Sequence, residues 1–145
     1  MISFSLLAIE IKVVYIDEFS GNAVIKPYKV SDNSNKAIEV LFDKLSTPPK
    51  IYKSFVPKDI FRAAYFLDNT LVVDLKKENL KKLDFFEERM TLYQILISLF
   101  RTFSVSEIYL LVDGKSETTL ANFVDISYSF SRKDWQTWPV EVNQY

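Results

Sequence analysis

The sequence contains no histidine and no cysteine, and it has only two glycines, Gly21 and Gly114, among 145 residues. Without an imidazole or a thiol, the chain has no histidine acid–base group, no cysteine nucleophile, no disulfide and no zinc or copper site built from those ligands. Two glycines are too few for a dinucleotide fingerprint or a phosphate-binding loop, which need several residues at positive φ. These absences exclude most enzyme classes, and we expect no catalytic residue, no cofactor and no metal.

The chain also lacks an excess of charge of one sign, with 18 Lys and Arg against 19 Asp and Glu and a formal net charge of −1 at pH 7. Nucleic-acid binding depends on a surplus of basic side chains facing phosphates, so we expect no nucleic-acid partner. Residues 2–9 are largely apolar, but a membrane span needs about 20 such residues, so we expect no span in this chain. No basic residue precedes this stretch and no cleavage site follows it, so it is not a complete signal peptide. We interpret this stretch as an apolar segment that leads into the first strand, and the alternative is a trimmed export signal.

Hydrophobic periodicity predicts six strands and two helices. Alternating apolar residues predict strands at 8–16 and 23–30 around a turn cluster, which indicates a hairpin. Helical spacing predicts one helix that follows the N-cap candidates at 31–34 and runs to about Leu45, stopped by Pro48 and Pro49, and a longer one over about 86–103. The remaining predicted strands are 60–67, 70–75, 107–112 and 124–131. The order ββαββαββ indicates a single α+β domain over residues 1–131, with a mixed or antiparallel sheet and both helices packed on one face.

Two elements have more apolar residues than one buried face requires. In the helix over 86–103, Ile95 and Ile97 lie outside the main apolar stripe, so the helix is either buried centrally, the interpretation we favour, or offers these two residues to a partner. The strand over 107–112 is almost continuously apolar, which is typical of a strand covered on both faces.

Three aspartates are candidates for paired carboxylates, which general acid–base catalysis or a calcium ion would need. Asp68 precedes Asn69 and Asp113 precedes Gly114, so both have an explanation as turn residues. Asp74 lies within an apolar run, and we expect it to cap the backbone amides of the turn at 76–80. The aspartates therefore do not predict a catalytic site.

Residues 132–145 form a C-terminal aromatic tail that carries both tryptophans, Trp135 and Trp138. Tryptophan is common at interface hot spots because it buries a large area with few rotatable bonds. The tail can equally fold back so that its rings cover the domain. We favour folding back and keep partner contact as the alternative.

Several separated segments together resemble the GerMN domain, the bacterial sporulation and spore germination module. The resemblance covers roughly residues 12–127 in the order and spacing of the family. Ser46 stands where the family commonly has glycine, and Ala121-Asn122 replace small glycine-rich residues. The matching segments are Leu45-Ser46-Thr47-Pro48-Pro49, Phe55-Val56-Pro57-Lys58-Asp59, Leu71-Val72-Val73-Asp74-Leu75, residues 92–100 with 105–115, and residues 120–127.

The resemblance implies an α+β module related to the ring-building motifs of envelope-spanning secretion assemblies, with no known enzymatic activity. It implies a location in the cell envelope or outside the cytoplasm, although the incomplete signal peptide leaves a cytoplasmic location open. We therefore expect a non-enzymatic protein-interaction or assembly module with a protein partner, which could be a second copy of the chain. The alternatives are a ligand-binding domain for a cell-wall fragment or other small molecule, with Tyr and Trp faces stacking on sugars, and a carboxylate-dependent hydrolase.

Overall fold

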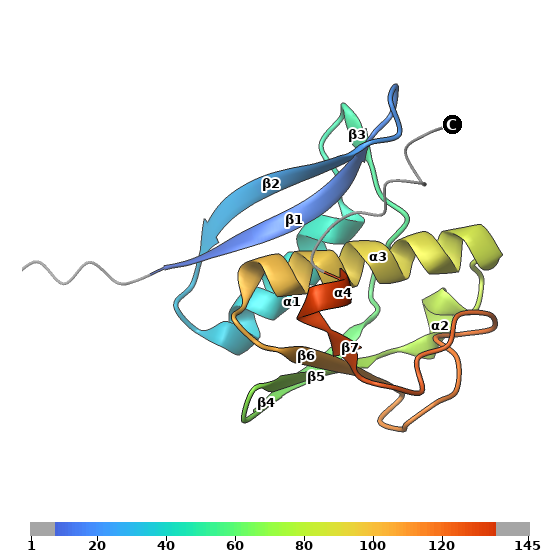
Figure 1. Ribbon diagram of the computed structural model, residues 1–145. Coiled ribbons are helices and arrows are strands. Elements are labelled where there is room, and N and C mark those ends of the chain that lie inside the picture. The colour runs from blue at the N-terminus through green and yellow to red at the C-terminus, as the bar shows by residue number, and fades with distance from the viewer. Residues whose placement is uncertain (1–7, 136–145) are drawn as a thin grey trace, which may run out of the picture.

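The structure, a computed structural model, describes residues 8–135, and it contains two β-sheets with helices between them (Figure 1). The α+β class and the single domain are confirmed. The strands form two sheets, however, where the sequence led us to expect one. In chain order the elements are β1 (Ile9–Asp17), β2 (Ala23–Val30), α1 (Ser34–Ser46), β3 (Tyr52–Lys53), β4 (Phe61–Leu67), β5 (Thr70–Leu75), α2 (Lys77–Leu80), α3 (Phe85–Thr102), β6 (Glu107–Val112), β7 (Phe130–Ser131) and α4 (Arg132–Trp135).

The first sheet has the strand order β2-β1-β3, and both of its pairings are antiparallel. The second has the order β4-β5-β6-β7, in which β5 and β6 run parallel and the other pairs run antiparallel. Because β5 and β6 are parallel, the chain must cross over between them, and α3 makes that crossover. The predicted hairpin of the first two strands and the predicted two-residue turn at Asp68-Asn69 are both confirmed.

The long helix α3 lies between the two sheets, with α1 beside it (Figure 1). Its residues Leu96, Leu99 and Phe100 are buried in a core that also contains side chains of β1, β5 and β6. Central burial of this helix, the interpretation favoured from the sequence, is therefore confirmed. Among the described residues, no helix combines the length and the apolarity that crossing a bilayer requires.

Local signals in the sequence set the ends of both long helices. The Asn33 side chain accepts a hydrogen bond from the Lys36 amide at 3.0 Å and begins α1, and the helix ends just before Pro48. At the start of α3, Asp84 and Glu87 each accept a hydrogen bond from the other's backbone amide, which is a complete capping box. The helix boundaries predicted from the sequence agree with these ends to within a residue or two.

Two strand predictions need correction. In β6 only one face is buried, because Tyr109 and Leu111 are partly exposed. The run at 124–131 forms a strand only at Phe130–Ser131. Before it, the Asp125 side chain accepts hydrogen bonds from the amide and the hydroxyl of Ser127, at 2.8 and 2.6 Å. Such local side-chain bonds compete with strand pairing and favour a turn.

Candidate interaction surface

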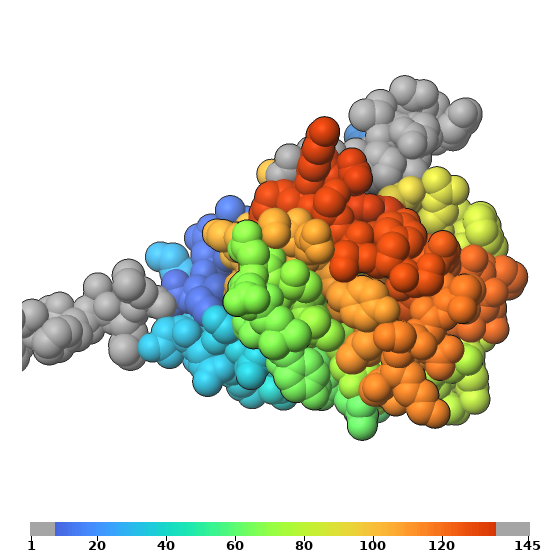
Figure 2. Space-filling view, turned by 60° about the horizontal axis from the view of Figure 1, so that its bottom comes forward, coloured from blue at the N-terminus to red at the C-terminus, as the bar shows by residue number. Residues whose placement is uncertain are grey.

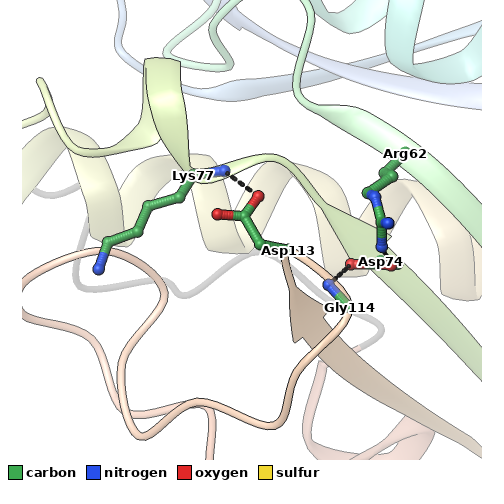
Figure 3. A network of polar contacts seen from close by, with 5 residues as sticks. All are labelled: Arg62, Asp74, Lys77, Asp113 and Gly114. Atoms are coloured by element: carbon green, nitrogen blue, oxygen red, sulfur yellow. Dashed lines mark hydrogen bonds and ion pairs between the residues drawn. The ribbon is translucent and has the colours of Figure 1, made fainter.

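The structure brings Asp74 and Asp113 to the same turn, while Asp68 lies at the other end of β5, and each of the two neighbouring carboxylates is engaged by its own partners. Asp74 is 1% exposed, and its Oδ2 lies 2.5 Å from the Arg62 Nη1 while its Oδ1 accepts a hydrogen bond from the Gly114 amide at 2.8 Å (Figure 3). Gly114 has φ +77, and a Cβ at this position would lie 2.8 Å from the Arg62 Nη1. Asp74 therefore ties β4 and β5 to the turn that follows β6.

We expected Asp74 to cap the backbone amides of the turn at 76–80, but Asp113 makes this contact instead. The Asp113 Oδ1 accepts a hydrogen bond from the Lys77 amide at 3.2 Å at the start of α2 (Figure 3). Asp113 can reach this amide because its own backbone adopts φ +51 in the turn after β6. Asp68 also has positive φ, at +54, and occupies the β4–β5 turn. The turn roles expected for Asp68 and Asp113 are thus what the structure shows.

One polar cleft of about 560 Å³ lies between α1 and the segment before β4. Its acidic residues include Glu39, Asp43 and Asp59, but Asp59 is paired with Lys76 at 2.8 Å and Glu39 with Lys36 at 3.8 Å. Within residues 8–135, no group of three or more acidic side chains is placed to hold a metal ion. The aromatic rings in its lining belong to Phe42 and Phe61, which stack on each other at 5.1 Å. Two of the three acidic side chains in the cleft are therefore in ion pairs and its two rings stack on each other, so the cleft does not favour a catalytic or sugar-binding site.

A buried carboxylate that the sequence analysis did not single out organises the loop before β7. Glu88 is 0% exposed, and its Oε2 accepts hydrogen bonds from the amides of Val124 and Phe123, at 2.7 and 3.0 Å, and at 3.3 Å from that of Ala121. Its Oε1 accepts one from the Asn122 amide at 3.0 Å. Four amides thus share the negative charge, and such hydrogen bonds to an ionised acceptor are strong. The sequence does contain a signal that Glu88 is buried, because Glu88 lies four residues before Leu92 on the apolar stripe of α3.

The two isoleucines proposed as interaction residues are not on the surface. Ile95 and Ile97 are 0% and 2% exposed, so neither is available to a partner in this structure. Trp135 is partly buried and packs against the core, with its ring centroid 5.2 Å from that of Phe130 and 5.0 Å from that of Tyr93. Trp138 lies outside the described residues.

Exposed apolar side chains occur at several places, and one group of them lies on the side of the four-stranded sheet that faces away from the helices. Alternate residues of β5 and β6 are buried toward the helices, so the residues between them point outward. Tyr65, Val72 and Tyr109 are directly paired across β4, β5 and β6 and form an apolar row on that side. We call this surface the outer face; it consists of Ala63, Tyr65, Leu67, Val72, Tyr109 and Leu111.

The outer face is open to solvent where β4 contributes to it. Tyr65 is 50% exposed and Leu67 is 61% exposed. Figure 2 looks onto this side of the molecule and shows the green atoms of β4 at the surface, between cyan atoms of α1 and orange atoms of β6. Beside this row, the Arg62 guanidinium covers the Asp74 carboxylate. The acidic side chain in the middle of the outer face is therefore neutralised by an ion pair.

A family model described as "Germane: Sporulation and spore germination" matches residues 12–118, which is more than half of the chain. The chain belongs to this family, the GerMN domains. No curated protein matches the sequence.

Solved structures show the same fold. The first GerMN domain of the sporulation protein GerM from Bacillus subtilis is 18% identical with a TM-score of 0.71, and the match covers 87% of this chain and 99% of that one. The tandem GerMN domains of the same protein give the same identity and TM-score, and this chain spans about half of their length, with 88% of this chain and 47% of that one covered. A candidate lipoprotein from Clostridium perfringens is 23% identical with a TM-score of 0.60, covering 92% of this chain and 95% of that one.

Proposed function

We propose that this GerMN domain is a non-enzymatic protein-interaction module of the bacterial cell envelope and that it binds its protein partner through the outer face. The observation that carries the proposal is the apolar outer face across β4, β5 and β6, on which Tyr65 and Leu67 are at least half exposed. Contiguous exposed apolar surface marks interaction sites, and tyrosine is enriched in them because it combines a large apolar ring with a polar tip.

The chemistry of the chain supports a binding role over catalysis. The chain has no histidine and no cysteine, and the buried carboxylates Asp74 and Glu88 are saturated by Arg62 and by backbone amides. A catalytic carboxylate has to remain available to a substrate proton or to a reacting carbon. These two groups hold turns in place, which is a structural use.

The envelope location is supported by the family and by the relatives. The family is described by sporulation and spore germination, one structural neighbour is a sporulation protein and another is a candidate lipoprotein. We infer that this domain acts at the envelope by holding other proteins in place, and the outer face supplies a surface for that.

Site-specific photocrosslinking tests the proposal. A benzoylphenylalanine in place of Tyr109 is expected to give a discrete ultraviolet-dependent adduct with a protein in the bacterium that produces the chain. The same probe at Ile51, an exposed apolar residue outside the outer face, is the matched control and is expected to give none. Adding Leu67→Lys to the Tyr109 probe places a charge on the outer face and should abolish the adduct. Equal labelling at both positions, or an adduct that is insensitive to Leu67→Lys, would contradict the proposal.

A further inference from the structure

The edges of the two sheets are protected very unequally. An exposed edge strand offers unpaired N–H and C=O groups to any other strand, and proteins blunt such edges with lysine, proline, bulges or covering segments. The edge strand β2 carries Lys26, Pro27 and Lys29, so it has both charge and a residue without an amide hydrogen. The strands at two other edges, β3 and β7, are only two residues long.

The strand β1 has β3 beside it only at its end, and side chains of α3 cover the rest of that edge. The Lys12 amide donates to the Thr102 Oγ1 at 2.9 Å and the Val14 amide to the Ser98 Oγ at 3.0 Å. The Val14 carbonyl accepts a hydrogen bond from the Gln94 Nε2 at 2.8 Å. These bonds satisfy backbone groups that would otherwise be open to another strand.

The strand β4 has no such protection from Ala63 to Leu67. Among residues 8–135 no strand pairs with its outer side. The stretch Ala63-Ala64-Tyr65-Phe66-Leu67 contains no charge and no proline, and its last three residues are exposed. The register shift of this strand lies before it, between Phe61 and Ala63. This edge therefore offers unpaired main-chain groups to another strand.

We propose that β4 pairs antiparallel with β4 of a second copy of this chain, about a two-fold axis at Tyr65. Leu67 flanks the two-residue turn and pairs with β5, so Ala64 and Phe66 direct their backbone groups away from β5. Centring the pairing on Tyr65 places Ala64 opposite Phe66 of the second copy, where both residues can exchange main-chain hydrogen bonds. It also places Ala63 opposite Leu67. Both of these off-axis pairs join a small apolar side chain with a large one, one pair on each face of the joined sheet.

Charge complementarity selects a second copy over an unrelated strand. The same register brings Arg62 of one copy opposite Asp68 of the other, and the two-fold axis repeats this pair at the other end of the interface. The Arg62 side chain is 51% exposed while it contacts Asp74, so part of the guanidinium is free to meet a second carboxylate. Asp68 is exposed in the β4–β5 turn. Shifting the register by two residues would lose both pairs.

This inference rests on the proposed function, because joining two copies through β4 makes one assembly surface from two outer faces.

The absence of native cysteine allows a clean cross-linking test in the full chain. Tyr65→Cys places two thiols in a directly opposed pair, about 4.5–5.5 Å apart between Cα atoms, which a disulfide can bridge. Leu67→Cys places them four residues out of register, about 14 Å apart, which it cannot bridge. Under mild oxidation we expect a disulfide dimer with Tyr65→Cys, none with Leu67→Cys, and one again with the double variant Ala63→Cys and Leu67→Cys.

Light scattering coupled to size exclusion gives the second measurement. The unmodified chain is expected to show a dimer mass that falls on dilution, and Tyr65→Lys, which opposes two like charges at the axis, should weaken dimerisation about tenfold or more. Tyr109→Lys makes the same chemical change on the outer face away from the axis, so it should leave the dimer intact. A monomer at all concentrations would contradict the proposed dimer, and so would a disulfide that forms with Leu67→Cys and not with Tyr65→Cys. If the Tyr109 photocrosslink persists in such a monomer, the proposed function survives without the dimer, whereas loss of both refutes both.

Discussion

Replacing Glu88 by glutamine tests whether a buried carboxylate holds the 121–124 loop. In the native chain Oε2 accepts from three amides and Oε1 from the Asn122 amide. Glutamine keeps the shape, and its best orientation leaves its oxygen in the place of Oε2. Its NH₂ group then faces the Asn122 amide, so two donors oppose each other in a buried site.

The cost follows from these contacts. An unsatisfied buried donor costs about 1–3 kcal/mol, and hydrogen bonds to a charged acceptor are worth about 1.5–3 kcal/mol against about 1 for neutral ones. One unsatisfied donor and three weakened bonds sum to about 2.5 kcal/mol at the lower end of these ranges and to more at the upper end. Because glutamine also removes the desolvation penalty of the buried charge, we expect a net loss of about 2–4 kcal/mol in the free energy of unfolding. For a domain of this size that corresponds to a fall of roughly 6–12 °C in Tm.

Urea denaturation and amide hydrogen exchange are the assays, and Glu87→Gln is the matched control. Glu87 is the neighbouring residue and its side chain accepts a hydrogen bond from the Asp84 amide, a role that glutamine also fills in a capping box. We expect Glu88→Gln to lower the urea midpoint and to speed exchange at the amides of residues 121–124, and Glu87→Gln to do neither. Unchanged stability and unchanged exchange in Glu88→Gln would refute the assignment of the loop to this carboxylate.

Other predictions concern turns and the C-terminal helix. Gly114→Ala should lower the free energy of unfolding by about 1–3 kcal/mol in chemical denaturation, because φ is +77 and the new Cβ meets the Arg62 guanidinium. Trp135→Ala removes ring contacts with Phe130 and Tyr93, so it should lower the free energy of unfolding by about 1–3 kcal/mol and lower Tm accordingly. An unchanged Tm would favour a partner role for this ring. Hydrogen bonds from the amides of Ser20 and Phe19 hold the pKa of Asp17 below its ordinary value. This contribution to stability is present above the ordinary pKa and disappears as pH falls through the lowered one, so NMR titration should show the hairpin turn loosening only at strongly acidic pH.

The sequence predicted the elements whose signals are local. The turn at Asp68-Asn69, the helix stop at Pro48 and the alternation in the first predicted strand, 8–16, each depend on neighbouring residues, and all three are found in the structure. Periodicity reports which face of an element is buried, but it does not say which element buries it. For that reason the two sheets were predicted as one.

The errors occurred where distant residues decide the outcome. Asp74 binds the amide of Gly114, which lies 40 residues away, while Asp113 caps α2 from 36 residues away. The amides of residues 121–124 bind Glu88 and not a neighbouring strand, so alternation in the following run did not produce a long strand. Each of these pairings joins segments that meet only in the folded chain.

The polar residues of α3 explain why we propose an interaction surface on a sheet and not on the middle of this helix. Gln94, Ser98 and Thr102 recur every four residues, a spacing that in an ordinary surface helix would mark the solvent side. Here that stripe hydrogen-bonds to the edge of β1, while the apolar stripe faces the core. A helix with both stripes engaged has no free face in its middle, where only Tyr93 of residues 90–100 is not fully buried. The unprotected backbone edge belongs to β4, and the most exposed residue of the apolar row, Tyr65, lies on the same strand. Both of the contacts that we propose for this domain therefore involve β4.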